Sequence, residues 1–201
     1  MSSIVILDYG SGNLRSAQRA FEHSGHSVVV TADFETALNA EGLVVPGVGA
    51  FGACMKGLQA IRGDEVVRER RTLNRPTLGI CVGMQIFFAH GIEHGNHAGV
   101  GIWPETVKKL TAPVLPHMGW NTVTVGKNSR LFAGVEDQSF YFVHSYGVID
   151  IPQSDAVVTT SSHGETFLAA IEDGSFSATQ FHPEKSGDAG LALIKNWVNT
   201  L

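Results

Sequence analysis

Hydrophobic and polar positions alternate in a regular rhythm through the first half of the chain. Four short apolar runs, rich in β-branched residues, predict strands that are buried on both faces: residues 4–9, 27–31, 42–46 and 77–81. The segments between and after them have helical spacing or charge typical of helices, at residues 12–25, 51–71 and 84–90. This succession of strands and helices predicts a parallel sheet with helices on both faces.

The second half has a different pattern. Closely spaced strand-like runs are separated by turn residues, as in SFYFVHSY (139–146), TFLAAIED (166–173) and FSATQFHP (176–183). They predict an antiparallel extension of the sheet, and a last helix is expected near 188–199. Because no linker or repeat interrupts the pattern, residues 1–201 are expected to form one α/β domain.

Composition narrows the classes of partner and compartment. The net charge is −5 and there is no basic run, so binding to nucleic acid or to an anionic membrane is not expected. No stretch approaches the ~20 apolar residues of a membrane span, and the N-terminus does not read as a signal peptide. Two cysteines make no disulfide framework, which favours a cytoplasmic setting.

Candidate chemistry begins with the stretch GICVG (79–83), where the fourth predicted strand meets the following helix. This is the pattern of a nucleophile elbow with cysteine in place of serine. Such a turn forces Cys81 into unfavourable backbone angles, so its neighbours must lack a Cβ that would clash. A helix N-terminus aimed at the sulfur favours the thiolate. Cys54, in a helical stretch without an elbow, is expected to be inert packing.

A thiol nucleophile needs a base and a group that orients the base. Near the C-terminus, His182 follows a predicted strand and Glu184 comes two residues later. Residues two apart in an extended segment point to the same side, so the carboxylate can fix the tautomer of the imidazole.

Acyl chemistry also requires an oxyanion hole. The backbone amide of Val82, directly after the nucleophile, is one expected donor. The segment VVPGVGAFG (44–52) follows another strand at the same sheet edge, and its amides at Gly47, Val48 and Gly49 are the candidates for a second donor.

Two other motifs are interpreted as decoys. GVGAFG (47–52) matches a dinucleotide fingerprint, but the acidic residue required ~20 residues later is absent. HGIEHGNH (90–97) contains an inverted zinc-peptidase pattern, but its glycines interrupt the helix that such ligands need, so no metal site is expected. We interpret its histidines as solvated side chains at a helix end: His90, His94 and His97.

The elbow, the PGVGAF segment and QFHPEKS together resemble the class I glutamine amidotransferases, which use a Cys-His-Glu triad. DYGSGNL (8–14), HMGWN (117–121) and YFVHSY (141–146) narrow the resemblance to the glutaminase subunits of imidazole glycerol phosphate synthases. It covers essentially the whole chain. The resemblance implies a flavodoxin-like three-layer sandwich with a central, mostly parallel sheet.

The resemblance also implies roles for further residues. Cys81 would attack the side-chain amide of glutamine, while His182 moves protons and Glu184 orients it. The PGVG loop would complete the oxyanion hole after a peptide flip triggered by a partner. The glutamine pocket would be formed by Gln85, Glu93, His144, Ser145 and Tyr146, with Glu93 on the α-amino group.

The implied partner is a (β/α)8 cyclase subunit, which receives the ammonia within a heterodimer and uses it in histidine biosynthesis; no cofactor is implied. Interface residues are expected in the matching motifs: Asn13, Met118, Trp120 and Lys185. His144 and Tyr146 could also be a strand end that simply packs, and Trp120 could equally be core.

Three alternatives stay open at this point. The chain could be the glutaminase subunit of another synthase, such as pyridoxal phosphate synthase, although DYGSGNL and HMGWN argue against it. It could be a cysteine peptidase or a chaperone-like protein that shares the elbow, which QFHPE disfavours. It could also be a non-catalytic regulatory subunit, which the intact set of Cys81, His182 and Glu184 opposes.

Overall fold

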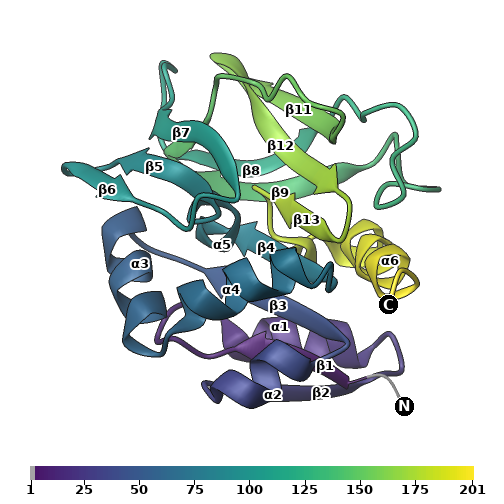
Figure 1. The fold of residues 1–201 in the computed structure, drawn as a ribbon. Coiled ribbons are helices and arrows are strands. Elements are labelled where there is room, and N and C mark those ends of the chain that lie inside the picture. Colours follow the sequence, from purple (N-terminus) through teal and green to yellow (C-terminus); the bar gives the residue numbers. More distant parts are fainter. Residues whose placement is uncertain (1–2) are drawn as a thin grey trace.

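A seven-stranded sheet lies at the centre of residues 3–201, which the computed structural model describes (Figure 1). The strand order is β11-β12-β13-β4-β3-β1-β2. The bounds are Ser3–Leu7 (β1), Ser27–Thr31 (β2), Gly42–Gly47 (β3), Thr77–Cys81 (β4), Val157–His163 (β11), Glu165–Asp173 (β12) and Phe176–Thr179 (β13). Strands β1 to β4 and β13 pair in parallel, whereas β12 runs antiparallel to both of its neighbours. This confirms the predicted parallel sheet with an antiparallel extension.

Helices cover both faces of this sheet and give the expected three layers (Figure 1). The bounds are Leu14–Glu22 (α1), Phe34–Asn39 (α2), Phe51–Ala60 (α3), Gly63–Thr72 (α4), Val82–Gln85 (α5) and Gly187–Val198 (α6), with a 3-10 turn at Pro183–Lys185 (η1). Helix α1 contacts α6, and α4 contacts both α2 and α3. Residues 1 and 2 of the expected domain lie outside the described range.

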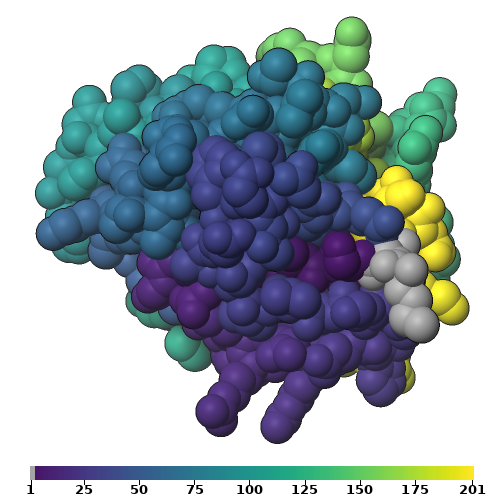
Figure 2. Space-filling model, turned by 60° about the horizontal axis from the view of Figure 1, so that its bottom comes forward, coloured from purple at the N-terminus to yellow at the C-terminus, as the bar shows by residue number. Residues whose placement is uncertain are grey.

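Burial follows position in the sheet. Every residue of the central strands β3 and β4 is buried, because helices cover them on both sides. The edge strand β2 is half-exposed instead. Seen from that edge, purple and blue residues of the N-terminal half form the near face, and yellow residues of the C-terminal end border it (Figure 2).

Within residues 3–201, no helix has both the length and the apolar character needed to cross a membrane.

Two features of the helices differ from the sequence prediction. The helix expected over 51–71 is two helices, because Arg62 adopts a left-handed conformation with φ 58° and ends the regular hydrogen bonding. Helix α2 was not predicted. It is short, and it is capped by the Asp33 carboxylate, which accepts the Thr36 N–H at 2.8 Å.

The prediction of a helix over residues 84–90 is also wrong. Helix α5 ends at Gln85, and the chain then enters a second, four-stranded sheet in the order β10-β7-β5-β6. Its strands are Phe88–Ile92 (β5), Asn96–Ala98 (β6), Trp103–Lys109 (β7) and Tyr146–Val148 (β10). Phe87 and Phe88 are both fully buried. A short apolar run that is buried on all sides has no periodicity that distinguishes helix from strand.

The histidine-rich segment is consequently a hairpin and not a helix end. Strands β5 and β6 pair antiparallel, and the turn between them holds His94 at φ 54° and Gly95 at φ 136°. His90 and His94 are exposed, as expected of solvated side chains, whereas His97 is half-buried with its Nε2 3.1 Å from the Glu93 carbonyl oxygen.

Candidate active site

Cys81 sits at a strained turn between β4 and α5. Its backbone has φ 56° and ψ −114°, a conformation that residues with a side chain rarely adopt. The flanking glycines are required sterically: a Cβ on Gly83 would lie 1.9 Å from the Val45 carbonyl oxygen, and one on Gly79 would lie 2.8 Å from the Phe87 ring. The tight turn that the sequence predicts is therefore present, and it places the thiol at the carboxyl edge of the sheet.

His182 and Glu184 form a buried pair after the end of β13. The two side chains meet as predicted, but through the 3-10 turn η1 at Pro183–Lys185 and not through the extended segment that the sequence suggested. The Nδ1 atom of His182 lies 2.7 Å from Glu184 Oε1, and the two side chains are only 2% and 4% exposed. A carboxylate only accepts hydrogen bonds, so Nδ1 carries the proton and the opposite nitrogen, Nε2, is left for chemistry. Among the described residues, Nε2 has no hydrogen-bond partner.

The charge state of His182 reflects its neighbours. Burial lowers its pKa, but the Cys81 thiol and the Glu184 carboxylate beside the ring outweigh this and raise the pKa to about 9. The ring is therefore held protonated near neutral pH, which leaves an Nε2–H group available as a proton donor.

A cavity of about 510 Å³ opens over this thiol. It is lined by most of the residues that the sequence assigns to the site: Val48, Gly49, Cys81, Val82, Gln85, Glu93, His144, Ser145, Tyr146, His182 and Lys185. Gly47 lies just behind, packed so closely on the elbow that a Cβ there would be 2.5 Å from the Gly83 nitrogen. Glu184 stands behind His182. The fold thus brings the elbow, the loop after β3 and the end of strand β9 (Ser139–His144) into one cavity.

The loop after β3 is held from behind by Ser11. The Val48 N–H donates to Ser11 Oγ at 3.0 Å, and that hydroxyl donates to the Val48 carbonyl at 2.8 Å. The Cys54 thiol donates to the same carbonyl at 3.3 Å and is buried. Cys54 therefore packs as expected and also anchors the loop. Gly49, at φ 93°, supplies a conformation that favours glycine.

The predicted pocket residues have partners within the protein. Gln85 Nε2 donates to the Tyr146 carbonyl at 2.8 Å and to Gln180 Oε1 at 2.9 Å. Glu93 Oε2 accepts the Phe51 N–H at 2.7 Å at the N-terminus of α3. Glu93 therefore also caps a helix that has no capping side chain of its own.

The four predicted interface residues are all exposed. Met118 and Trp120 lie on β8 (His117–Thr122), which pairs with β9 (Ser139–His144), and are 63% and 59% exposed. Trp120 is therefore not part of the core. Asn13 caps α1 by accepting the Ser16 N–H at 3.3 Å, and Lys185 lies at the rim of the cavity.

Sequence reasoning missed three residues of this region. Ser11 lies inside DYGSGNL, and its contact with the loop could not be inferred without the fold. Gln180 is fully buried, and its Nε2 lies 3.8 Å from the Cys81 sulfur. It occupies the position two before His182, so the alternation along a strand could have suggested it. Lys109 lines the cavity from β7, a strand that was not predicted.

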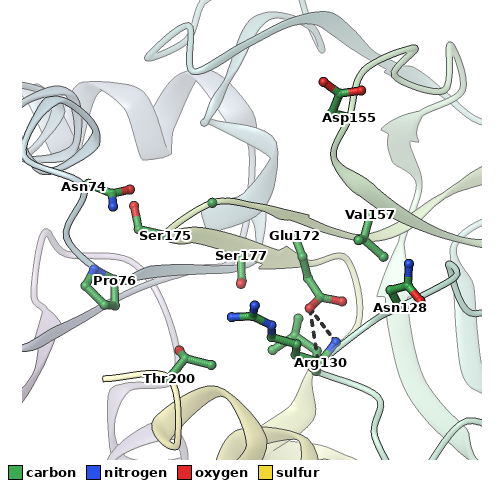
Figure 3. Close-up of a pocket in the computed structure, with 12 residues that line it drawn as sticks. Asn74, Pro76, Asn128, Arg130, Asp155, Val157, Glu172, Ser175, Ser177 and Thr200 are labelled. Carbon is green, nitrogen blue, oxygen red and sulfur yellow. Dashed lines mark hydrogen bonds between the residues drawn. The ribbon is translucent and has the colours of Figure 1, made fainter.

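A second cavity lies at the opposite, amino edge of the sheet, where β4 and β13 begin. Its volume is about 610 Å³ and its lining includes Pro76, Ser175 and Ser177 (Figure 3). Glu172 accepts the backbone N–H of Arg130 at 2.9 Å, and the Arg130 side chain extends into the cavity near Ser177. None of the residues assigned to the site from the sequence lines it.

The chain belongs to the glutamine amidotransferase class-I family, which matches residues 5–200. It is 59% identical to the imidazole glycerol phosphate synthase subunit HisH of Mycolicibacterium paratuberculosis, over 99% of this chain and 98% of that protein. The HisH subunit of Streptomyces avermitilis is 56% identical over 98% and 96% of the two chains. Within the family, the chain therefore falls among the HisH subunits of imidazole glycerol phosphate synthase and is a glutamine amidotransferase enzyme.

Solved structures show the same fold at low identity. A putative GMP synthase subunit from Thermoplasma acidophilum aligns with a TM-score of 0.74 at 20% identity, covering 99% of this chain and 93% of that one. The PurLQS structure from Thermotoga maritima aligns with a TM-score of 0.76 at 18% identity, over 99% and 98% of the two chains.

Proposed function

We propose that Cys81 attacks the side-chain amide carbon of glutamine and forms a glutamyl thioester as the carbon–nitrogen bond breaks. The His182 imidazolium gives its Nε2 proton to the departing nitrogen, which leaves as ammonia. The neutral ring then takes a proton from water, whose oxygen attacks the thioester and releases glutamate. Glu184 holds the ring in the required tautomer. The observation that carries this proposal is the strained Cys81 turn in one cavity with the buried His182–Glu184 pair.

The oxyanion hole is proposed to form from the Val82 amide and the loop of Gly47, Val48 and Gly49. In the free chain the Val48 amide is engaged by Ser11 Oγ. A missing donor costs roughly 2.7–4 kcal/mol of transition-state stabilisation, or 10²–10³ in rate. We therefore expect the isolated chain to hydrolyse glutamine slowly until a partner redirects this amide.

The substrate is proposed to lie between the loop and the ends of β9 and β10. Gln85, His144, Ser145 and Tyr146 would form its wall, and the Glu93 carboxylate would receive the α-amino group. Glu93 already accepts one N–H from the start of α3, so that carboxylate is held in place before the ligand arrives.

A partner subunit follows from the family, since the relatives are named as subunits of a synthase. We propose that the partner is a (β/α)8 cyclase that receives the ammonia for histidine biosynthesis, in the cytoplasm, where thiols stay reduced. The exposed apolar side chains of Met118 and Trp120 support a contact surface at β8, to which Asn13 and Lys185 would contribute.

Co-purification with the cyclase subunit, followed by glutamine hydrolysis assays with and without it, tests the proposal. We expect a stable complex and a rate at least about 10² above that of the isolated chain, the value of one oxyanion donor. Absence of a complex, or the full rate in the isolated chain, would contradict the partner-dependent part of the proposal.

A further inference from the structure

Two buried histidines connect the wall of the Cys81 cavity to a strand outside it. Strands β8 and β9 lie side by side (Figure 1). His117 on β8 and His144 on β9 face each other across this pair, and His117 Nδ1 lies 3.0 Å from His144 Nε2. On one side, His144 Nδ1 lies 2.9 Å from the Tyr146 carbonyl oxygen. On the other, His117 Nε2 lies 3.2 Å from Asn121 Nδ2. His144 and Tyr146 line the cavity, whereas His117 and Asn121 do not.

The direction of these hydrogen bonds is fixed at the cavity end. The Tyr146 carbonyl can only accept, so the proton of His144 must be on Nδ1. In a neutral ring, Nε2 of His144 is then an acceptor, and the facing Nδ1 of His117 must be the donor. His117 Nε2 is left as an acceptor.

The outer end requires the same direction independently. Asn121 Oδ1 accepts the Thr122 N–H at 2.9 Å, which identifies its other terminal atom as the amide nitrogen. That nitrogen donates to the Ser162 carbonyl at 3.0 Å and to His117 Nε2. Both ends of the series therefore agree on one polarity, from Asn121 through His117 and His144 to Tyr146.

The surroundings keep both rings neutral. His117 and His144 are 5% and 6% exposed and pack on Phe142 and Phe167. Burial, which removes solvation of the charged form, lowers the pKa of His117 to about 4 and that of His144 to about 3. A charged ring at either position would also place two N–H groups against each other.

We propose that His117 and Asn121 are positioning residues for glutamine binding, which act by locking His144 as the Nδ1–H tautomer and thereby fixing the Tyr146 carbonyl in the cavity wall. We call the series Asn121–His117–His144–Tyr146 the histidine relay. The same carbonyl accepts Gln85 Nε2 at 2.8 Å, so the relay holds two neighbouring wall residues. It also keeps His144 from competing with His182 for a proton. This inference rests on the proposed glutaminase function.

Nitrogen-15 NMR of the histidine rings tests the tautomers in the full chain, without turnover or partner. Free imidazole side chains prefer the Nε2–H tautomer in water. We expect His117 and His144 to show the opposite, Nδ1–H form near neutral pH. An Nε2–H tautomer at either ring would overturn the relay.

Glutamine kinetics in the complex with the cyclase subunit test the positioning role. His117→Phe keeps an aromatic ring but removes both nitrogens, and we expect the KM for glutamine to rise about fivefold, the value of one hydrogen bond, with kcat within about twofold. His117→Asn, whose amide nitrogen takes the place of Nδ1 and can donate to His144, should bring the KM most of the way back to the parent value.

The matched control is His163→Phe. His163 stacks on His117 with ring centroids 4.3 Å apart but bonds to the Val114 carbonyl and is outside the relay. Its KM should stay near the parent value. Equal KM values for the His117→Phe and His163→Phe variants would contradict the positioning role. If the parent complex fails to hydrolyse glutamine, the proposed function fails, while the NMR result still decides the relay.

Discussion

The two cavities at opposite ends of β4 differ in chemistry more than in size. The one at the amino edge is larger, about 610 Å³ against about 510 Å³. It holds Arg130 among hydroxyl and amide side chains, together with the carboxylates of Asp155 and Glu172, of which Glu172 already accepts two backbone N–H groups. The cavity at the carboxyl edge holds the thiol of Cys81, whose backbone is strained, and the imidazole of His182, whose pKa is raised to about 9.

This difference follows from the direction of parallel strands. Loops that leave the carboxyl ends of β3, β4 and β13 converge at one edge and deliver the Val48 loop, Cys81 and His182 to the same place. The amino edge collects the ends of helices and the starts of strands, and the described residues that line its cavity include neither cysteine nor histidine. Volume alone therefore does not identify the cavity that we propose as the active site, whereas strand direction does.

The largest expected effect comes from removing the nucleophile. Cys81→Ala should abolish glutamine-dependent synthesis by the complex with the cyclase, because no thioester can form. Synthesis from added ammonia should be kept, since we propose that the partner performs that step. Parallel assays with the two nitrogen sources measure this. Loss of both activities in a complex that still assembles would contradict the division of labour.

Removing the carboxylate behind the base should have the next largest effect. Glu184→Gln should lower glutamine hydrolysis by about 10²-fold, in the range of general acid–base catalysis, and lower the His182 pKa from about 9, because the carboxylate stabilises the imidazolium. An NMR titration of His182 measures the shift. An unchanged midpoint would show that Glu184 does not set the charge of the ring.

The same pairing has a consequence for stability. The pKa of His182 in the folded chain lies above its ordinary value of 6.5. The stabilisation that the protonated ring adds to the free energy of unfolding is therefore fully present below about pH 6.5 and is lost as the pH rises through about 9. Urea unfolding of the parent and of Glu184→Gln at pH 6 and pH 10 should show a smaller pH dependence in the variant.

A smaller effect is expected at the loop. Ser11→Ala frees the Val48 amide and should raise glutamine hydrolysis by the isolated chain about fivefold, the value of one neutral hydrogen bond. In the complex, where we propose that the amide is already redirected, the rate should change less than twofold. A lower rate in the isolated variant would show that Ser11 supports the loop and does not restrain it.

The smallest effect tests the other cavity. Arg130→Ala removes the arginine that lines this cavity, and kcat/KM for glutamine should stay within about twofold of the parent. A loss of tenfold or more would mean that the two ends of β4 are coupled, and the contrast drawn between them would not hold.

The parallel part of the fold is predictable from sequence because it depends on local patterns. Buried strands such as residues 42–46 and 77–81 are apolar runs bounded by turn residues, and both appear as β3 and β4. The helix prediction for residues 84–90 failed because the structure of this segment depends on contacts that are not local. That segment is buried by contacts with distant strands, β7 among them, and its own period carries no information about them.

The residues of the proposed site also fall into two groups, those that local sequence motifs predict and those that only the fold brings together. Cys81, His182 and Glu184 could be proposed from short motifs, because the turn and the spacing by two are local properties of the chain. Ser11 and the His117–Asn121 pair could not be assigned, since their roles depend on hydrogen bonds between segments brought together only by the fold.

Trapping the acyl intermediate tests the central claim most directly. The complex is mixed with glutamine, quenched with acid within one turnover and examined by mass spectrometry of the peptide that contains Cys81. The account predicts a glutamyl adduct on Cys81 in the parent and none in Cys81→Ala. Glutamine hydrolysis by the parent with no adduct on Cys81, or an adduct on Cys54 instead, would contradict it.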